Sequence, residues 1–269
     1  MLNKNRLSLI LGGALTALSG SALAIPTLQI GAYAGAGDSG TYADYIPALH
    51  SPSEADTATT SDNTILVAGN YSGKIAGSDI LNLGGKYTST GEDWGKVASD
   101  AGLALDYSVF DGHGAVLVVS VADGSTGSLT VNGASAFHSD TDISYFPNDH
   151  DPVQAATSDF LFFDIGDFTG PQSTIYNFDD ETGTGVGVIK ELTINVSGYD
   201  WLHFDVMALA SYTDKTTGKN KTTFINADLE NNPGSKDVTW KEATSVSAPS
   251  TLAMLSLGLL GFAARRKRS

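Results

Sequence analysis

Short apolar and β-branched runs, separated by Gly, Asn, Asp and Ser, recur along the chain and constrain its fold more than any other feature. Residues 191–196 alternate polar and apolar side chains, as a strand with one solvent-facing side does. Residues 115–121 are apolar on both faces, as in a central strand. The nine runs are 64–68, 103–110, 115–121, 128–131, 160–165, 188–196, 201–209, 222–227 and 237–240. Many short strands with this punctuation predict an all-β fold, a β-sandwich of jelly-roll type.

The segments between these runs are assigned from their composition. The Asp-Gly at 123–124 and the Asn-Gly at 132–133 offer the positive φ that tight hairpins need. Residues 34–62, rich in Ala, Gly, Ser, Thr and Asp, are expected to form a long surface loop. Residues 93–101 have weak helical spacing, and we expect one short helix there. The chain has no cysteine, so packing and backbone pairing alone must stabilise the fold.

The N-terminus has the three parts of a secretory signal peptide. Lys4 and Arg6 precede an apolar run, and the small residues Ala22 and Ala24 mark the cleavage site. The apolar run is shorter than the ~20 residues that span a bilayer as a helix. We therefore expect a signal peptide over residues 1–24, read by the export machinery and cleaved after Ala24. The alternative is an uncleaved N-terminal anchor.

The C-terminus combines a turn-prone Pro-Ser, a short apolar run and a basic end. As a helix, residues 251–264 would cover about 21 Å, short of the ~30 Å hydrocarbon core. The four cations that follow are Arg265, Arg266, Lys267 and Arg268. Cations beside an apolar segment stay in the cytoplasm, so the main domain should face outward. We predict a short transmembrane helix that holds the chain transiently in the inner membrane; the alternative is an ordinary membrane tail.

The residues before this helix resemble the PEP-CTERM sorting signal of Gram-negative bacteria that make exopolysaccharide. The matching positions are Val246, Ser247, Ala248, Pro249, Ser250 and Thr251. The second proline, the Ser-Thr, the apolar helix and the basic end of that signal are present, whereas its first proline and its glutamate are replaced by Ser247 and Ala248. The resemblance implies that an exosortase-like protease cuts the chain near this motif.

The mature part carries a second resemblance, which rests on scattered strings. These strings lie at 25–30, 145–147 and 202–206. They resemble the choice-of-anchor N proteins, a set of secreted bacterial proteins with such sorting tails. The resemblance implies an extracellular domain with an anchor and says nothing about chemistry. We assign one domain to residues 25–240, a linker to 241–248 and the sorting tail to 249–269.

The predicted mature chain is strongly acidic. The two targeting ends contain six of the fifteen Lys and Arg residues and no acid. The rest of the chain therefore has nine cations against thirty acids, a formal charge of −21. Such a surface repels phosphate backbones, which excludes nucleic acid as a partner, and it attracts divalent cations. Its roughly 220 residues are enough for one sizeable core.

The densest acidic segment, residues 138–151, is a candidate calcium loop. Its carboxylates are those of Asp140, Asp142, Asp149 and Asp151. Calcium takes about six to eight oxygen ligands, which closely spaced carboxylates supply. An EF-hand is improbable because Tyr145 stands where its sharp turn needs Gly. The alternative, which we favour, is a solvated loop.

Aromatic side chains beside turns are candidates for stacking on sugar rings, and Trp94 and Trp201 are the two that we select. The alternative is ordinary packing, because most aromatic residues of an all-β protein lie in its core.

The sequence gives little support for a catalytic site. Acids at 164–167 and 179–181 could form the carboxylate pair of a glycosidase, but acids are too abundant here for that pairing to be specific. No histidine has His-x-His or His-Glu-x-x-His spacing, so a zinc site lacks support. His203 and Asp205 point to one face of a predicted strand, and we interpret them as a hydrogen-bonded structural pair. We expect no enzyme activity.

These features together predict an exported protein of the cell surface or exopolysaccharide matrix of a Gram-negative bacterium, with a structural or interaction role. The first alternative is a carbohydrate-binding module, calcium-assisted, which polysaccharide would retain until EDTA is added. The second alternative is an extracellular glycan hydrolase, which would need a concave site with two carboxylates.

Overall fold

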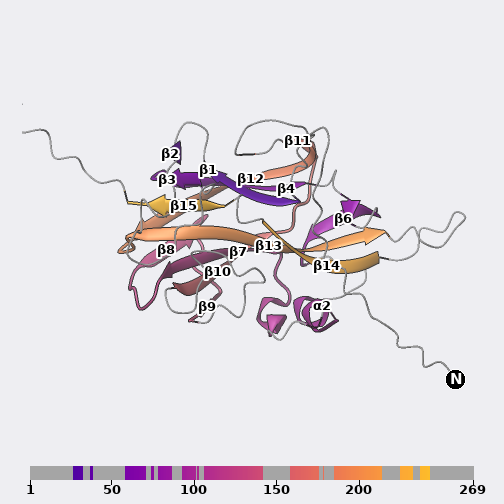
Figure 1. Cartoon of the computed structure of the whole chain (residues 1–269), viewed down its shortest axis with the longest axis horizontal. Coiled ribbons are helices and arrows are strands. Elements are labelled where there is room, and N and C mark those ends of the chain that lie inside the picture. Colours follow the sequence, from indigo (N-terminus) through magenta and orange to yellow (C-terminus); the bar gives the residue numbers. More distant parts are fainter. Residues whose placement is uncertain are drawn as a thin grey trace, which may run out of the picture.

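The structure is a computed structural model that describes residues 27–32, 37–38, 58–70, 74–75, 78–86, 93–100, 102, 106–141, 158–175, 178, 185–213, 225–232 and 237–242. Within these residues the strands form two sheets that pack on each other (Figure 1). The prediction of an all-β sandwich is confirmed.

The first sheet is antiparallel and has the order β1-β4-β12-β11, with β8 also paired to β12. Its strands are β1 (Leu28–Ala32), β4 (Thr64–Asn70), β8 (Ser128–Val131), β11 (Ser173–Ile175) and β12 (Gly185–Ser197). The long β12 pairs with β11 at its start, with β4 over its middle and with β8 at its end. This strand therefore joins all parts of the first sheet except β1.

The second sheet has the order β2-β3-β15-β13-β7-β10-β9, with β14 and β6 on β13, and β5 on β6. Its strands are β2 (Gly37–Asp38), β3 (Ala58–Thr60), β5 (Lys74–Ile75), β6 (Ser78–Gly84), β7 (Ala115–Ala122), β9 (His138–Asp140), β10 (Ser158–Gly166), β13 (Trp201–Thr213), β14 (Ile225–Asn231) and β15 (Val238–Lys241). All pairs are antiparallel except β3 with β15, which is parallel.

The 13-residue β13 is the centre of the second sheet. Its first half lies between β15 and β7, and its second half lies between β14 and β6. Strands β14 and β15 therefore follow one another along the same edge of β13. Their ladders leave a gap at Asp205 and Val206, because β14 ends opposite Met207 and β15 begins opposite Phe204.

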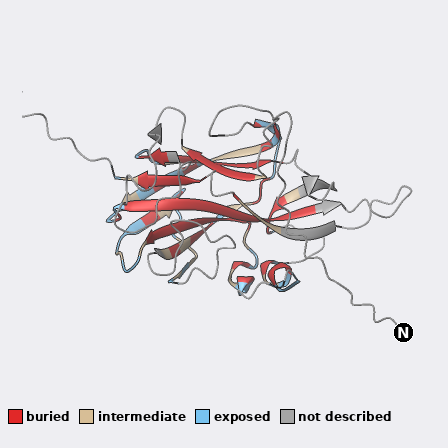
Figure 2. Ribbon diagram, in the orientation of Figure 1, coloured by how far each residue is buried: buried red, intermediate tan, exposed pale blue. Residues whose placement is uncertain are grey.

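The main core lies between the two sheets and takes alternate residues from the strands. From β13 it takes Leu202, Phe204, Val206, Ala208 and Ala210. The first sheet contributes apolar side chains of β1, β4, β8 and β12 to the same core. Because the residues between them on β13 are also buried, this strand is buried on both faces (Figure 2).

A second apolar cluster covers the opposite face of the second sheet. Helix α2 (Trp94–Asp100) and the 3-10 helix η1 (Tyr107–Phe110) supply buried side chains that pack on β7, β10 and β13. The strand residues of this cluster are Val116, Val118, Phe160, Phe162, Met207 and Leu209. The second sheet is therefore a middle layer, with the first sheet on one side and the two short helices on the other.

Two predictions of local structure are wrong where the structure describes the chain. The sequence predicts a strand over 103–110, but the last four of these residues form η1. Asp106 caps this helix, because its carboxylate accepts a hydrogen bond from the Ser108 amide at 3.0 Å. Residues 34–62 were expected to be surface loop, yet they contain β2 and β3, and Thr59 is buried in the second sheet. The helix expected at 93–101 is confirmed as α2.

Candidate functional site

The gap between β14 and β15 holds a cluster of buried polar residues on one face of the second sheet. His203 lies on β13 and pairs with Thr239 of β15. The same register places Asp237, the residue before β15, opposite Asp205 of β13. Because His203 and Asp205 are two residues apart, their side chains point to one face of the strand. This face is the one that carries the second apolar cluster, not the core between the sheets.

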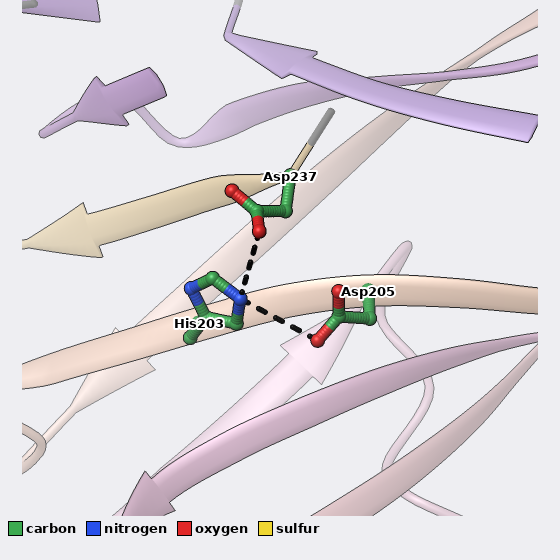
Figure 3. A group of neighbouring side chains, drawn as sticks. All are labelled: His203, Asp205 and Asp237. Atoms are coloured by element: carbon green, nitrogen blue, oxygen red, sulfur yellow. Dashed lines mark ion pairs between the residues drawn. The ribbon is translucent and has the colours of Figure 1, made fainter. Parts of the chain in front are cut away.

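Three of these side chains converge on one point (Figure 3). The Nε2 atom of His203 lies 3.5 Å from Oδ2 of Asp205 and 3.4 Å from Oδ2 of Asp237. One ligand atom from each residue lies within 4.8 Å of the other two. All three side chains are buried, with relative exposures of 0–1 %. Two carboxylates and an imidazole at this depth need compensation by hydrogen bonds or by opposite charge.

Neighbouring polar groups fix the orientation of two of these side chains. The hydroxyl of Thr239 lies 2.9 Å from Nδ1 of His203, which leaves Nε2 directed toward the carboxylates. The side-chain amide of Asn232 donates to Oδ1 of Asp205 at 3.0 Å. The Oδ1 atom of Asn232 accepts a hydrogen bond from the Val206 amide at 2.7 Å, so Asn232 also closes the gap in the ladder. The imidazole and one carboxylate are thus preorganised by the backbone pairing around them.

Ser120 brings a sixth polar side chain to the cluster. It lies on β7 directly opposite His203, on the side of β13 away from β15. Residues that are directly opposite in an antiparallel pair project to the same face, with Cβ atoms about 4.5–5.5 Å apart. Ser120 is fully buried, and its Oγ has no hydrogen-bond partner among the residues that the structure describes. Its side chain therefore projects to the same face of the sheet as the imidazole.

A second His–Asp pair lies near the start of β7. Nδ1 of His113 is 3.2 Å from Oδ2 of Asp164, and Oδ1 of Asp164 accepts from the amides of Gly114 and Gly166 at 3.1 and 2.8 Å. Burial raises the pKa of Asp164, but the Gly166 amide, His113 and the Gly114 amide together lower that pKa below its ordinary value. This carboxylate holds two loops together through three donors.

The carboxylate of Asp167 also binds backbone amides. Its Oδ1 accepts from the amides of Gly85 and Lys86 at 3.0 and 3.1 Å. Lys190 of β12 donates to the carbonyl of Ile165 at 2.8 Å, and burial lowers its pKa while the charges of Asp167 and Asp164 oppose that shift. The acids that the sequence offered for a glycosidase pair at 164–167 are therefore engaged with backbone amides.

An open groove lies between the end of the first sheet and the edge of the second. Its volume is about 520 Å³, and its walls are residues 127–130 and 135–139 together with Leu161 and Tyr199. A smaller cavity of about 190 Å³ shares Ser139, Leu161 and Tyr199 with the groove and is lined by Asp140 and Asp159. Hydroxyl groups, the imidazole of His138 and the rings of Phe137 and Tyr199 line the groove.

The predicted site residues have different outcomes. Trp94 and Trp201 are 1 % and 5 % exposed, and Trp94 packs in the second cluster, so their burial favours the packing role. Of the calcium candidates, Asp140 lies on β9, where its carboxylate accepts from the amide of Thr141. Asp142, Asp149 and Asp151 lie outside the described residues. The calcium loop therefore stays a prediction.

The targeting residues also lie outside the part that the structure describes. They are Ala22, Ala24, Val246, Ser247, Ala248, Pro249, Ser250 and Thr251. No helix among the described residues is long and apolar enough to cross a membrane.

Comparison with protein-family models finds the PEP-CTERM protein-sorting motif at residues 245–268. No curated protein and no solved structure matches the chain. The motif follows β15, the last described strand, by a few residues. The chain is therefore an all-β protein with a sorting tail. It is an exported protein that is anchored transiently in the membrane and sorted through an exosortase. The resemblance of the mature domain to choice-of-anchor N proteins stays a prediction.

Sequence reasoning identified His203 and Asp205 as a pair on one face but missed Asp237, Asn232 and Ser120. Asp237 directly precedes β15, Asn232 directly follows β14 and Ser120 lies on β7, and only strand register brings them to the pair. The one feature of the sequence that indicates this cluster is the His-x-Asp at 203–205, inside an apolar stretch of a predicted strand.

Proposed function

We propose that this chain is a non-enzymatic protein of the bacterial cell surface or exopolysaccharide matrix, where its β-sandwich acts structurally or by interaction. The observation that carries the proposal is the sorting motif at 245–268, placed directly after a folded all-β domain. The formal charge of −21 over the mature part suits a hydrated, acidic polymer matrix in which divalent cations bridge acidic groups.

The buried polar cluster supports a non-enzymatic role. Among the described residues, His203, Asp205 and Asp237 are the one group of three His, Asp or Glu side chains that could hold a metal ion, and all three are 0–1 % exposed. A polymer cannot reach such a group without unfolding of the sheet. The carboxylates of Asp164 and Asp167 hold backbone amides in place.

The test is intact mass and fractionation of the native protein in cells with and without the exosortase. We expect wild-type cells to release a species that begins near Ile25 and lacks the apolar tail, and the mutant to keep the tail and the membrane association. A matched variant in which Arg265, Arg266, Lys267 and Arg268 are replaced by Ser separates retention from cleavage, because it removes the cations that hold the tail in the cytoplasm. A tail that survives in the released wild-type protein would contradict the proposal.

A second candidate function, carbohydrate binding, is favoured by the groove beside Tyr199. Its volume of about 520 Å³ suits one or two sugar rings, and its walls offer hydroxyl donors and acceptors. Ser139 lines both the groove and the smaller cavity and is exposed, so Ser139→Arg should fill the groove without disturbing the core.

Retention on matrix polysaccharide tests this candidate. We expect Ser139→Arg to abolish retention, while the same change at the exposed Ser173 of β11, outside the groove, leaves retention intact. Elution by EDTA would further indicate calcium, with Asp140 at the edge of the cavity as one ligand. Equal retention of the two variants would exclude the groove.

A further inference from the structure

We propose that His203, Asp205 and Asp237 bind one divalent transition-metal ion, of the zinc class, which stabilises the exported fold. The proposal rests on the geometry of the gap between β14 and β15 and does not depend on the sorting tail. It assigns a structural role to residues that lie inside an otherwise apolar layer.

The distances between the ligand atoms fit a metal ion better than a direct hydrogen bond. Nε2 of His203 lies 3.5 and 3.4 Å from the two Oδ2 atoms, which is longer than the ~2.7–3.2 Å of an N–H···O hydrogen bond. Ligand atoms about 2.0–2.2 Å from a tetrahedral ion are about 3.3–3.6 Å apart. Both measured separations fall within that interval. The spacing is therefore that of ligands around a common centre.

The charges of the three side chains also favour a bound divalent ion. Continued past Phe204 and Val238, the register of β13 and β15 brings Asp237 opposite Asp205, and like charges in such a pair destabilise a sheet. A neutral imidazole and two carboxylates carry two negative charges at full burial, which a divalent ion balances.

The residues around the three ligands have the arrangement that metal sites use to orient their ligands. Thr239 contacts Nδ1 of His203, so that Nε2 is the atom that faces the site. Asn232 donates to the Oδ1 atom of Asp205 that is not directed at His203. Ser120, fully buried and opposite His203, places a hydroxyl on the same face of the sheet as the imidazole.

The ligand set selects the class of metal. Imidazole suits zinc and the later first-row ions, whereas calcium and magnesium prefer oxygen alone and calcium needs about six to eight ligands. One nitrogen and two carboxylate oxygens are a set that zinc accepts. The ion would connect β13 directly to the start of β15, next to the point where the ladder is interrupted. In an exported chain with no cysteine, it supplies the cross-link that a disulfide would otherwise provide.

The experiment uses the processed protein as cells release it. We expect elemental analysis to find about one equivalent of a transition metal, and a chelator to remove it. Re-addition of Zn²⁺ at about a hundred times its Kd should then raise Tm by about 5–10 °C. A Co²⁺-loaded sample should show the visible absorption of a tetrahedral nitrogen–oxygen site. Excess Ca²⁺ should not displace Zn²⁺.

Variants locate the ion. Asp237→Asn keeps the size of the side chain and should abolish stoichiometric binding. Thr239→Val, which keeps the shape but removes the contact to Nδ1 of His203, should weaken Zn²⁺ binding by about 10- to 100-fold. Asp164→Asn is the matched control, because it alters another His–Asp pair of the same sheet and should leave Zn²⁺ affinity unchanged.

The proposal is overturned if the folded wild-type protein, stripped and exposed again to Zn²⁺, binds no ion and unfolds at an unchanged temperature. It is also overturned if Ca²⁺ displaces Zn²⁺ or if Thr239→Val binds Zn²⁺ as tightly as the wild type. If Asp237→Asn does not fold, the Thr239→Val affinity and the Tm response of the wild type still decide the question.

Discussion

Replacement of Phe110 by Ala tests the second apolar layer, which lies on the same face of the second sheet as the polar cluster. Phe110 is the last residue of η1 and is fully buried. Its ring lies 5.7 Å from that of Trp94, 5.7 Å from Tyr107, 6.1 Å from Phe137 and 5.1 Å from Phe162. It therefore joins α2, η1 and the second sheet at one point.

The expected loss follows from the contacts that the ring makes. A Phe→Ala change in a packed core lowers the free energy of unfolding by about 3–5 kcal/mol, since it leaves a cavity as well as removing buried area. Edge-to-face partners on several sides favour the upper half of that range. For a domain of about 220 residues, each kcal/mol lowers Tm by about 2–4 °C, so a drop of about 8–20 °C is expected.

Calorimetry and urea unfolding measure this loss. Val186→Ala on β12 is the matched control, because Val186 is 44 % exposed and its truncation should cost under about 0.5 kcal/mol. The urea slope should be the same in both variants, which would show that the cooperative unit is unchanged. A Phe110→Ala loss no larger than that of the control would refute the packed second layer.

Three further predictions concern local geometry and are all measured by urea midpoints. Asp164→Asn should lower stability by about 1–2 kcal/mol at neutral pH. Because the pKa of Asp164 is lowered in the folded state, its carboxylate contributes fully to stability above the ordinary carboxyl pKa, and this contribution is lost as pH falls through the folded-state pKa. The urea midpoints of the wild type and the variant should therefore become equal near pH 2. A difference between them that does not change with pH would contradict this role of Asp164. Gly187→Ala should cost about 2–3 kcal/mol, since a Cβ there would lie 1.9 Å from the carbonyl oxygen of Gly69; a neutral result would contradict the close β4–β12 approach. Asn132→Val should lower the free energy of unfolding by about 1–2 kcal/mol more than Asn132→Gly does. Both variants lose the hydrogen bond from the Thr193 amide, but only valine disfavours the φ of 51° at this position. Equal urea midpoints for the two variants would refute this explanation.

Most strand positions could be predicted because their signal is local. Residues 191–196 alternate in exposure as their sequence indicates, and residues 115–121 are all buried as their apolar composition indicates. Positive φ was also correctly placed, at Gly124 and at Asn132 with Gly133. These features depend on the side chains of consecutive residues, which determine which face is wet and which turn is allowed.

The connections could not be predicted in the same way. The turn at Gly124 is not a hairpin, because β7 belongs to the second sheet and β8 to the first. The small and polar segment 34–62 contributes β2 and β3, whose pairing depends on the edge that β15 offers. Edge strands of this kind form because a neighbouring ladder needs partners, and their own sequence carries little preference for the strand.

The polar cluster could be predicted only in part, because its members come from different strands. His203 and Asp205 interrupt an apolar strand, and a break in the hydrophobic pattern at positions that the fold buries requires compensation from another part of the chain. The sequence reveals the break but not the compensating partner, because Asp237 becomes a neighbour only when Thr239 pairs with His203. A shift of β15 by one residue would direct Asp237 into the core between the sheets and Val238 toward the imidazole. The register that buries Val238 and Trp240 in the main core therefore also assembles the three ligand atoms, so hydrophobic packing and the proposed metal site depend on the same strand pairing.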